Sequence, residues 1–419
     1  MTESIKKPEL LAPAGDFEKM KTAVHYGADA VYLGDGRFSL RAMTGNFNLD
    51  GIAGAVAYCR ERGVKVYVTA NIFPHNEDIP GLREHIGLLG EIAPDALVVS
   101  DPGVVKLTKE IAPALSIHIS TQANITNWLS ARFWQEMGAS RIVLARELSL
   151  PEIKEIRSQT TLELEAFVHG SICISYSGRC YLSSFMADRS ANRGECTNSC
   201  RWNYYLVEEK RPGEYFPIME DDRGTYVMSS RDLCTIGHVP ELIEAGIDSF
   251  KIEGRMKGIN YVGGVVKAYR EAIDTFCTSP EDFSLNDRLM RELQMISSRG
   301  YTEGMYFGEP DERDYNFDKS SYRMSHDLVG VVKEVVNGLA VVLLKSKLTV
   351  GESVEFLSSG VEDTRYTVNE MLGEGGEVKH VGKNTEIIRI PVPSYVRAGD
   401  LIRREKTAPQ QFIIQKKTV

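Results

Sequence analysis

The segment "ELLAPAGDFEKMKTAVHYGADAVYLG" (residues 9–34) contains the pattern that decides the fold. It begins with the apolar run "ELLAPAG" (9–15) and ends with a second apolar run, "DAVYLG" (29–34). The stretch between them, "DFEKMKTAVHYG", looks helical and ends in glycine, a common helix stop. Two strands joined by a helix are typical of a βαβ unit, in which the strands are parallel.

The same alternation continues through the first two-thirds of the chain. Six further strand-like runs follow: "VKVYVTANI" (64–72), "DALVVSD" (95–101), "SIHISTQAN" (116–124), "RIVLAREL" (141–148), "LELEAFVHG" (162–170) and "SFKIEGR" (249–255). Eight βα units that close on themselves form a (β/α)8 barrel, whereas an open doubly wound sheet is the alternative. The count of eight favours the barrel. We expect it over residues 1–280, with an insertion at 171–232 after strand seven.

The pattern changes after "YVGGVVKAYREAIDTF" (261–276), which is expected to be the last barrel helix. Residues 281–325 are expected to form a helical linker. From residue 326 to 419 the chain reads as short strands such as "LVGVVKEVV", "LAVVLLKS" and "TEIIRIPVP", punctuated by Gly and Asn. This predicts a small all-β barrel domain, for which an accessory role is expected because no catalytic cluster is visible in it.

Composition limits the class of protein. Hydrophobic residues make up 42% of the 419 residues and charged residues 26%, as in ordinary globular proteins. No apolar run approaches the roughly 20 residues needed to span a bilayer, and no signal peptide is visible, so we expect a cytoplasmic protein without a membrane partner. The net charge of -9 argues against broad nonspecific binding of nucleic acid but permits a local basic patch.

Polar side chains stand at the ends of most predicted strands. They are Asn71, Asp101, Gln122, Arg146, Glu147, His169, Glu253 and Arg255. In a barrel these ends face one mouth, where barrel enzymes place their chemistry. The sequence therefore predicts an active site at this mouth.

Four of the seven cysteines lie close together, in "CISYSGRC" (173–180) and "CTNSC" (196–200). The pattern C-x6-C-x15-C-x3-C differs from the two tight pairs of a zinc knuckle, whereas iron–sulfur clusters accept more varied spacings. Structural disulfides are rare in the cytoplasm, where clustered cysteines are more often metal ligands or redox groups. A metal or cluster is favoured here over a catalytic thiol or unrelated thiols. The candidate ligands are Cys173, Cys180, Cys196, Cys200 and, in "SSRDLC", Cys234.

The cations at the mouth could bind an anionic ligand. Guanidinium groups bind carboxylates with two hydrogen bonds, so Arg146 and Arg255 are candidates, with Lys251 as a further charge. Equally, these cations could pair with Glu147 and Glu253 and brace the barrel. The sequence leaves both readings open.

Amide and titratable side chains complete the predicted site. Gln122 and Asn124 could orient a ligand through hydrogen bonds. His169 could move protons at neutral pH, with Glu147 and Glu253 as acidic partners in a catalytic set. The alternative for His169 is a packed structural histidine.

Arginines interleaved with aromatic residues surround the cysteines. Arg179, Arg193 and Arg201 are followed by Trp202 and Tyr204. This mixture suits contact with phosphates and stacking on bases of RNA. A polar loop with a few packed aromatic residues is the alternative.

The stretch "EAFVHGSICISYSGRCYLSS" (165–184) closely resembles the signature of the collagenase-like peptidase family. "STQANITN", "NRGECTNSCRW" and "SFKIEGRMK" continue the resemblance. Several members of that family are linked to oxygen-independent hydroxylation of the tRNA wobble uridine, of an rRNA cytidine or of ubiquinone. They resemble one another in a cysteine-bound 4Fe-4S cluster and in dependence on prephenate.

The resemblance is greatest to the members that act on tRNA, and it implies formation of 5-hydroxyuridine in the anticodon loop. It implies a 4Fe-4S cluster on Cys173, Cys180, Cys196 and either Cys200 or Cys234, and prephenate as co-substrate. A paralogous family member is a further partner that it allows. The alternatives are a peptidase, as the family label says, or hydroxylation of another substrate. For a peptidase, neither a "GxSxG" elbow nor an "HExxH" motif appears.

Overall fold

The computed structural model describes residues 5–40, 47–173, 175–201, 205–206, 216–217, 230–284, 287–309, 314, 323–358 and 365–406. The chain divides into two compact units. The first comprises Met1–Met290 and Ser297–Arg323, and the second Arg291–Ile296 and Met324–Val419. The segment 281–325, expected as a helical linker, therefore contributes to both units.

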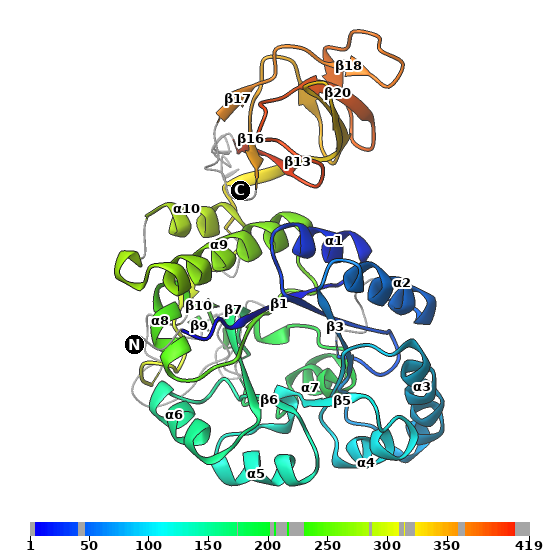
Figure 1. The fold of residues 1–419 in the computed structure, drawn as a ribbon, viewed down its shortest axis with the longest axis vertical. Coiled ribbons are helices and arrows are strands. Elements are labelled where there is room, and N and C mark those ends of the chain that lie inside the picture. Colours follow the sequence, from blue (N-terminus) through cyan, green and yellow to red (C-terminus); the bar gives the residue numbers. More distant parts are fainter. Residues whose placement is uncertain are drawn as a thin grey trace, which may run out of the picture. The chain divides into compact units, whose positions relative to one another are not determined.

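Eight parallel strands of the first unit close into a barrel (Figure 1). They are β1 (Glu9–Pro13), β2 (Ala30–Gly34), β3 (Lys65–Ala70), β4 (Ala96–Val99), β5 (Ser116–Ile119), β6 (Arg141–Val143), β7 (Glu163–Ser171) and β11 (Ser249–Ile252). Strand β11 pairs with β1 on one side and with β7 on the other, which closes the ring. The predicted barrel is confirmed; seven of the eight strands lie within the predicted runs, and β7 extends one residue beyond its run, to Ser171.

Helices follow the strands and surround them (Figure 1). They are α1 (Phe17–His25), α2 (Leu49–Arg60), α3 (Ile79–Ile92), α4 (Pro102–Ile111), α5 (Trp128–Glu136), α6 (Leu150–Gln159), α8 (Val239–Glu244) and α9 (Ile259–Thr278). Side chains cap several N-termini, as helices require. Asp101, expected at the active-site mouth, instead caps α4 by accepting hydrogen bonds from the amides of Gly103 (2.8 Å) and Val104 (3.1 Å).

The barrel contains a network of ionised side chains, which we call the ion network: Glu9, Arg141, Glu163, Glu165 and Lys251. The Arg141 guanidinium contacts the carboxylates of Glu9 (2.6 Å), Glu163 (2.7 Å) and Glu165 (3.1 Å). The Lys251 ammonium contacts Glu165 at 2.6 Å. Burial opposes the charge of Arg141, but the carboxylates of Glu165 and Glu9 raise its pKa. Both cations of the ion network thus have carboxylate partners.

A long insertion separates β7 from β11. Its elements are α7 (Leu182–Ala187), the 3-10 turns Ala191–Arg193 and Ser199–Arg201, β8 (Tyr205–Leu206), β9 (Phe216–Pro217) and β10 (Asp232–Cys234). Strand β10 returns antiparallel to β7, and β12 (Tyr301–Thr302) pairs with β10. Figure 1 draws α7 inside the ring of outer helices.

The second unit is an antiparallel β-domain, as predicted. Its main strands are β13 (His326–Val336), β14 (Leu339–Leu344), β16 (Ser353–Leu357), β20 (Ile387–Pro391) and β21 (Leu401–Glu405). Shorter strands are β15 (Leu348–Thr349), β17 (Arg365–Thr367), β18 (Leu372–Gly373) and β19 (Val381–Gly382). The C-terminal part of α10 (Asp287–Met295) also belongs to this unit. Alternating residues such as Val342, Leu344 and Ile388 form its apolar core. None of the described helices is long and apolar enough to cross a bilayer.

Candidate functional site

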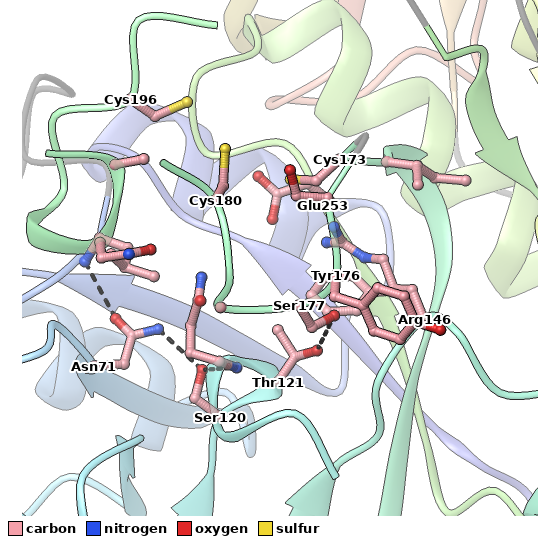
Figure 2. A pocket seen from close by; sticks show the side chains of 18 of the residues that line it. Asn71, Ser120, Thr121, Arg146, Cys173, Tyr176, Ser177, Cys180, Cys196 and Glu253 are labelled. Carbon is pink, nitrogen blue, oxygen red and sulfur yellow. Dashed lines mark hydrogen bonds between the residues drawn. The ribbon is translucent and has the colours of Figure 1, made fainter. Parts of the chain in front are cut away.

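A cavity lies at the mouth of the barrel, where the carboxyl ends of the strands meet the insertion (Figure 2). The strand ends contribute Asn71, Ser120, Gln122, Arg146, Glu253 and Arg255 to its lining. The insertion contributes Cys173, Tyr176, Gly178, Cys180, Cys196 and Cys200. The structure therefore brings most of the predicted mouth residues and the cysteine cluster to one place.

Four thiols line this cavity. Figure 2 shows Cys173, Cys180 and Cys196 on the same side of it, and Cys200 belongs to the same lining. Cys234 is placed elsewhere: it lies on β10 opposite His169, is buried, and is no part of the lining described. Burial raises the pKa of its thiol to about 11, which favours the protonated form. Of the two candidates for a fourth ligand, Cys200 is at the cavity and Cys234 is not.

The thiols at the cavity have the donor chemistry of a metal or iron–sulfur site. All seven cysteines lie within the described residues, and no disulfide joins them. Among the described residues, no three His, Cys, Asp or Glu side chains gather closely enough to hold one metal ion. A cluster of several irons is bound by one thiolate on each iron, so its ligands stand further apart than those of one zinc ion. Four thiols around one cavity have that donor chemistry.

The cysteine loop at 173–180 is held in place by two contacts. The Glu147 carboxylate accepts hydrogen bonds from the amide of Ser177 (2.9 Å) and from its hydroxyl (3.1 Å). Gly178 has a φ of +74°, and a Cβ there would stand 2.3 Å from the Gln122 carbonyl oxygen. Only glycine allows so close an approach. Glu147, predicted to be catalytic, thus has a role in holding the loop that carries Cys173 and Cys180.

A third contact ties the insertion to the loop after β3. The Arg193 guanidinium contacts the Asp78 carboxylate at 2.9 Å, and the amide of Phe73 donates to the Asn192 carbonyl at 3.1 Å. Arg193, predicted to bind RNA, is therefore engaged within the protein. Arg179 is exposed, whereas the side chain of Arg201 lies outside the described part.

The three predicted anion-binding cations have different surroundings. Lys251 is paired with Glu165. Arg255 is buried and donates to the hydroxyls of Ser39 (3.0 Å) and Thr69 (3.2 Å) and to the carbonyl of Leu40. Lys251 and Arg255 thus both brace the barrel, as the alternative interpretation expected, although their partners are not Glu147 and Glu253.

Of the three predicted cations, Arg146 has the fewest hydrogen bonds and ion pairs with described residues. Its guanidinium lies over the Phe167 ring, 3.9 Å from the ring centroid, and it lines the cavity. Its Nε is buried, and no described residue forms a hydrogen bond with that atom. None of the ion pairs among the described residues includes Arg146. A buried donor without a partner is costly, so Arg146 is the strongest candidate to receive an anionic ligand.

The two predicted amides also differ. Gln122 lines the cavity, and its buried Oε1 has no hydrogen-bond partner among the described residues. Asn124 is no part of the described lining and adopts a left-handed backbone with a φ of 54°. Gln122 can therefore contact a ligand in the cavity, whereas Asn124 ends the turn that positions Gln122.

His169 is packed behind the cavity. Its side chain is 1% exposed, and its ring lies 5.4 to 5.8 Å from the rings of Tyr261, Tyr269 and Tyr301. Burial lowers its pKa to about 3, so the ring is neutral at physiological pH. It is no part of the described lining, and these contacts match the alternative of a packed histidine. Glu253 does line the cavity, where the Tyr32 hydroxyl donates to it at 3.4 Å.

Several residues at the cavity are not predicted by the sequence pattern. Tyr176, Ser177 and Asn192 line it, although nothing in the cysteine spacing marks them. Their place depends on how the insertion folds back over the strand ends. The glycine in "YSGRC" was the available signal, because a glycine between two candidate ligands suggests close approach to another segment.

Comparison with known proteins identifies the family. The model of "Peptidase family U32" matches residues 15–316, and that of "Peptidase family U32 C-terminal domain" matches residues 324–403. The chain is 38% identical to tRNA hydroxylation protein P1 of Bacillus subtilis over 96% of each chain, and 38% identical to tRNA hydroxylation protein P of Escherichia coli over 92% of this chain and 94% of that protein. It is 34% identical to a protein named Collagenase from Porphyromonas gingivalis over 72% of this chain and 74% of that protein. The matches span both units, and the chain belongs to peptidase family U32.

Proposed function

We propose that this protein hydroxylates the wobble uridine of tRNA to 5-hydroxyuridine, without oxygen and with prephenate as co-substrate. The observation that carries the proposal is the cavity at the barrel mouth, where four thiols meet polar strand ends. The names and the high coverage of the two bacterial tRNA hydroxylation proteins support tRNA as the substrate. A tRNA substrate would place the reaction in the cytoplasm.

Cys173, Cys180, Cys196 and Cys200 would hold a 4Fe-4S cluster at this cavity. Thiolates are the soft ligands that such clusters require. When bound, the cluster would supply either a Lewis-acidic iron or electron transfer. Glu147 and Gly178 would contribute by keeping the loop between Cys173 and Cys180 against the strand ends.

Prephenate would bind through its carboxylates. Arg146 offers a fork of donors with a buried Nε that lacks a partner among the described residues, and Gln122 offers an amide in the same cavity. Charge-assisted hydrogen bonds to a carboxylate would satisfy Arg146. Arg255 would add positive potential from behind, since it also lines the cavity.

The net reaction balances if prephenate is the source of the hydroxyl group. The C5–H bond of uracil becomes C5–OH, and the donor carbon that loses its hydroxyl receives hydrogen. The base is thereby oxidised by two electrons and the donor is reduced by two. The protein's own part is to hold both molecules in one cavity, since fixed proximity is a large part of catalysis.

A peptidase has less support at this cavity. Among the described residues of its lining none is a histidine, so no thiol or hydroxyl there has an imidazole base beside it. The grounds for that alternative are the family name and relatives whose names indicate a protease or a collagenase.

Nucleoside mass spectrometry of tRNA tests the function. A strain that lacks the gene, grown without oxygen so that no oxygen-dependent enzyme can substitute, should lose 5-hydroxyuridine and its derivatives. A strain unable to make prephenate should show the same loss. If tRNA of the deletion strain keeps its 5-hydroxyuridine, with no paralogue present, the proposal is wrong.

Metal and sulfide analysis of anaerobically purified protein tests the cofactor. Iron and inorganic sulfide should be present, and Cys180→Ser or Cys200→Ser should remove most of both. Cys234→Ser is the matched control and should retain them, because Cys234 lies away from the cavity. Stoichiometric zinc without sulfide would contradict the cluster.

A further inference from the structure

The insertion carries several exposed apolar side chains. Phe185 is 87% exposed and Tyr181 is 75% exposed, and Tyr176 and Met186 are also exposed. Large apolar side chains that gather on a surface indicate an interaction site. Tyr176 itself lines the cavity, and Tyr181 directly follows Cys180, another residue of the lining.

Helix α7 presents two of these rings on one face. Tyr181 precedes the helix and Phe185 lies one turn later, since the amide of Phe185 donates to the Tyr181 carbonyl at 3.0 Å. Side chains four residues apart in a helix are neighbours, with about 5–6 Å between their Cβ atoms. The two rings therefore form a small aromatic surface.

The opposite face of α7 is anchored to the cavity wall. Ser183 is buried, and its hydroxyl accepts hydrogen bonds from the amide and the hydroxyl of Thr197, each at 3.1 Å. The same hydroxyl lies 3.9 Å from the Sγ of Cys196, which lines the cavity. The aromatic surface is thus fixed relative to the thiols.

Two arginines flank the aromatic surface. Arg179 is exposed and Arg189 is half-buried, and neither takes part in an ion pair among the described residues. Both guanidinium groups can therefore contact phosphates, even though the whole chain has a net charge of -9.

We propose that Tyr181 and Phe185 form a stacking surface for the unpaired nucleotides that flank the target base, with Arg179 and Arg189 contacting their phosphates. This inference rests on the proposed function. Proteins recognise single-stranded loops of RNA by stacking splayed bases on aromatic side chains. A base that enters the cavity must bring its neighbours to the rim, where these rings lie.

Binding of a fluorescent anticodon stem–loop RNA to the anaerobically purified full-length protein tests the surface. The double variant Tyr181→Ala/Phe185→Ala should bind the stem–loop about tenfold or more weakly, because stacking contributes about 1–3 kcal/mol per base. Tyr181→Phe/Phe185→Trp, which keeps aromatic rings, should retain the affinity. Binding to a fully paired duplex of the same stem should be weak and unchanged by the double substitution.

Phe133→Ala is the matched control, because Phe133 is an exposed aromatic residue on α5, away from the insertion. It should bind the stem–loop like the wild type. Arg179→Gln should reduce the dependence of binding on salt by about one phosphate contact. Equal binding by the double alanine variant and the wild type would overturn the inference.

The test separates this inference from the proposed function. If the wild-type protein modifies tRNA and the double alanine variant binds and modifies it equally well, only the stacking surface is wrong. If the deletion strain keeps its modified uridine, the proposed function fails whatever the binding result. A change in self-association of the double variant, with unchanged RNA affinity, would assign the surface to a protein partner and overturn the inference.

Discussion

The ion network inside the barrel and the cavity at its mouth differ in how their charged groups are partnered. Arg141 and Lys251 have carboxylate partners at 2.6 to 3.1 Å. At the mouth, the Nε of Arg146 and the Oε1 of Gln122 are buried without hydrogen-bond partners among the described residues. Removal of one partner from a buried ion pair is costly, whereas unpartnered polar atoms that also line a cavity leave contacts that a ligand can complete.

Glu165→Gln should have the largest effect on stability. Glu165 is buried and contacts both Arg141 and Lys251. Its neutralisation leaves the buried Lys251 ammonium without its carboxylate partner, whereas Arg141 keeps two others. Loss of one partner of a buried pair costs about 3–5 kcal/mol. Chemical denaturation should show a decrease of that size in the free energy of unfolding.

The same substitution at the mouth is the control for that experiment. Glu147→Gln removes a charge whose contacts are hydrogen bonds from Ser177 in a half-exposed loop, so we expect a loss of about 1 kcal/mol or less. Similar losses for the two variants would mean that the ion network and the mouth do not differ in the way their charges are partnered.

Arg146→Met should show the reverse behaviour, with little change in stability and a clear loss of ligand binding. The methionine keeps an apolar contact with Phe167 but removes the guanidinium. Hydrogen bonds to charged groups contribute about 1.5–3 kcal/mol, which corresponds to a decrease of roughly 10- to 100-fold in affinity for prephenate.

Calorimetric titration with prephenate measures this effect. Arg146→Lys should recover part of the affinity, since an ammonium keeps the charge without the fork of donors. Unchanged affinity in Arg146→Met would show that another group binds the anion.

The sequence predicted the barrel more fully than it predicted the site. Strands were predictable because each is a local apolar run with a helix after it, and the four cavity cysteines were predictable because they cluster in the chain. Partners of charged groups were less predictable, because they come from distant strands. Lys251, for example, pairs with Glu165 on β7 rather than with Glu253 two residues away.

Some roles at the mouth depend on the direction of a side chain, which the sequence does not give. Asn124 follows β5 and His169 lies near the end of β7, at positions that suit a site, yet both lie outside the described cavity lining. Successive residues of a strand point to opposite faces, and a turn after the strand removes even that regularity. The sequence shows Gly178 within the cysteine motif. Its close approach to the Gln122 carbonyl cannot be predicted without knowing how the insertion folds.

Gly178→Ala should loosen the cysteine loop without affecting the ion network. A side chain there meets the Gln122 carbonyl and a φ of +74°, at a cost of about 1–3 kcal/mol. The amide of Ser177, now bonded to Glu147, should exchange its hydrogen roughly tenfold faster or more. Gly258→Ala is the control, because a Cβ at that position has no neighbour within 4 Å. Equal exchange at Ser177 in both variants would show that Gly178 does not hold the loop.

The last prediction concerns the contribution of His169 to the pH dependence of stability. Its pKa is about 3 in the folded protein, whereas an unperturbed histidine has a pKa near 6.5. Between these pH values the unfolded chain binds a proton and the folded protein does not, so this contribution to stability is complete above about pH 6.5 and is lost as the pH falls towards 3. From about pH 7.5 to 5.5 the expected loss is about 1.4 kcal/mol.

His169→Phe keeps a ring among Tyr261, Tyr269 and Tyr301 but binds no proton, so its unfolding free energy should fall by that much less over the same range. Denaturation curves at the two pH values measure the difference, and the higher pH serves as the internal reference because the histidine is neutral there in both states. An equal decrease in the wild type and in His169→Phe would mean that the ring titrates in the folded protein, as an open site at the mouth would allow and a packed position would not.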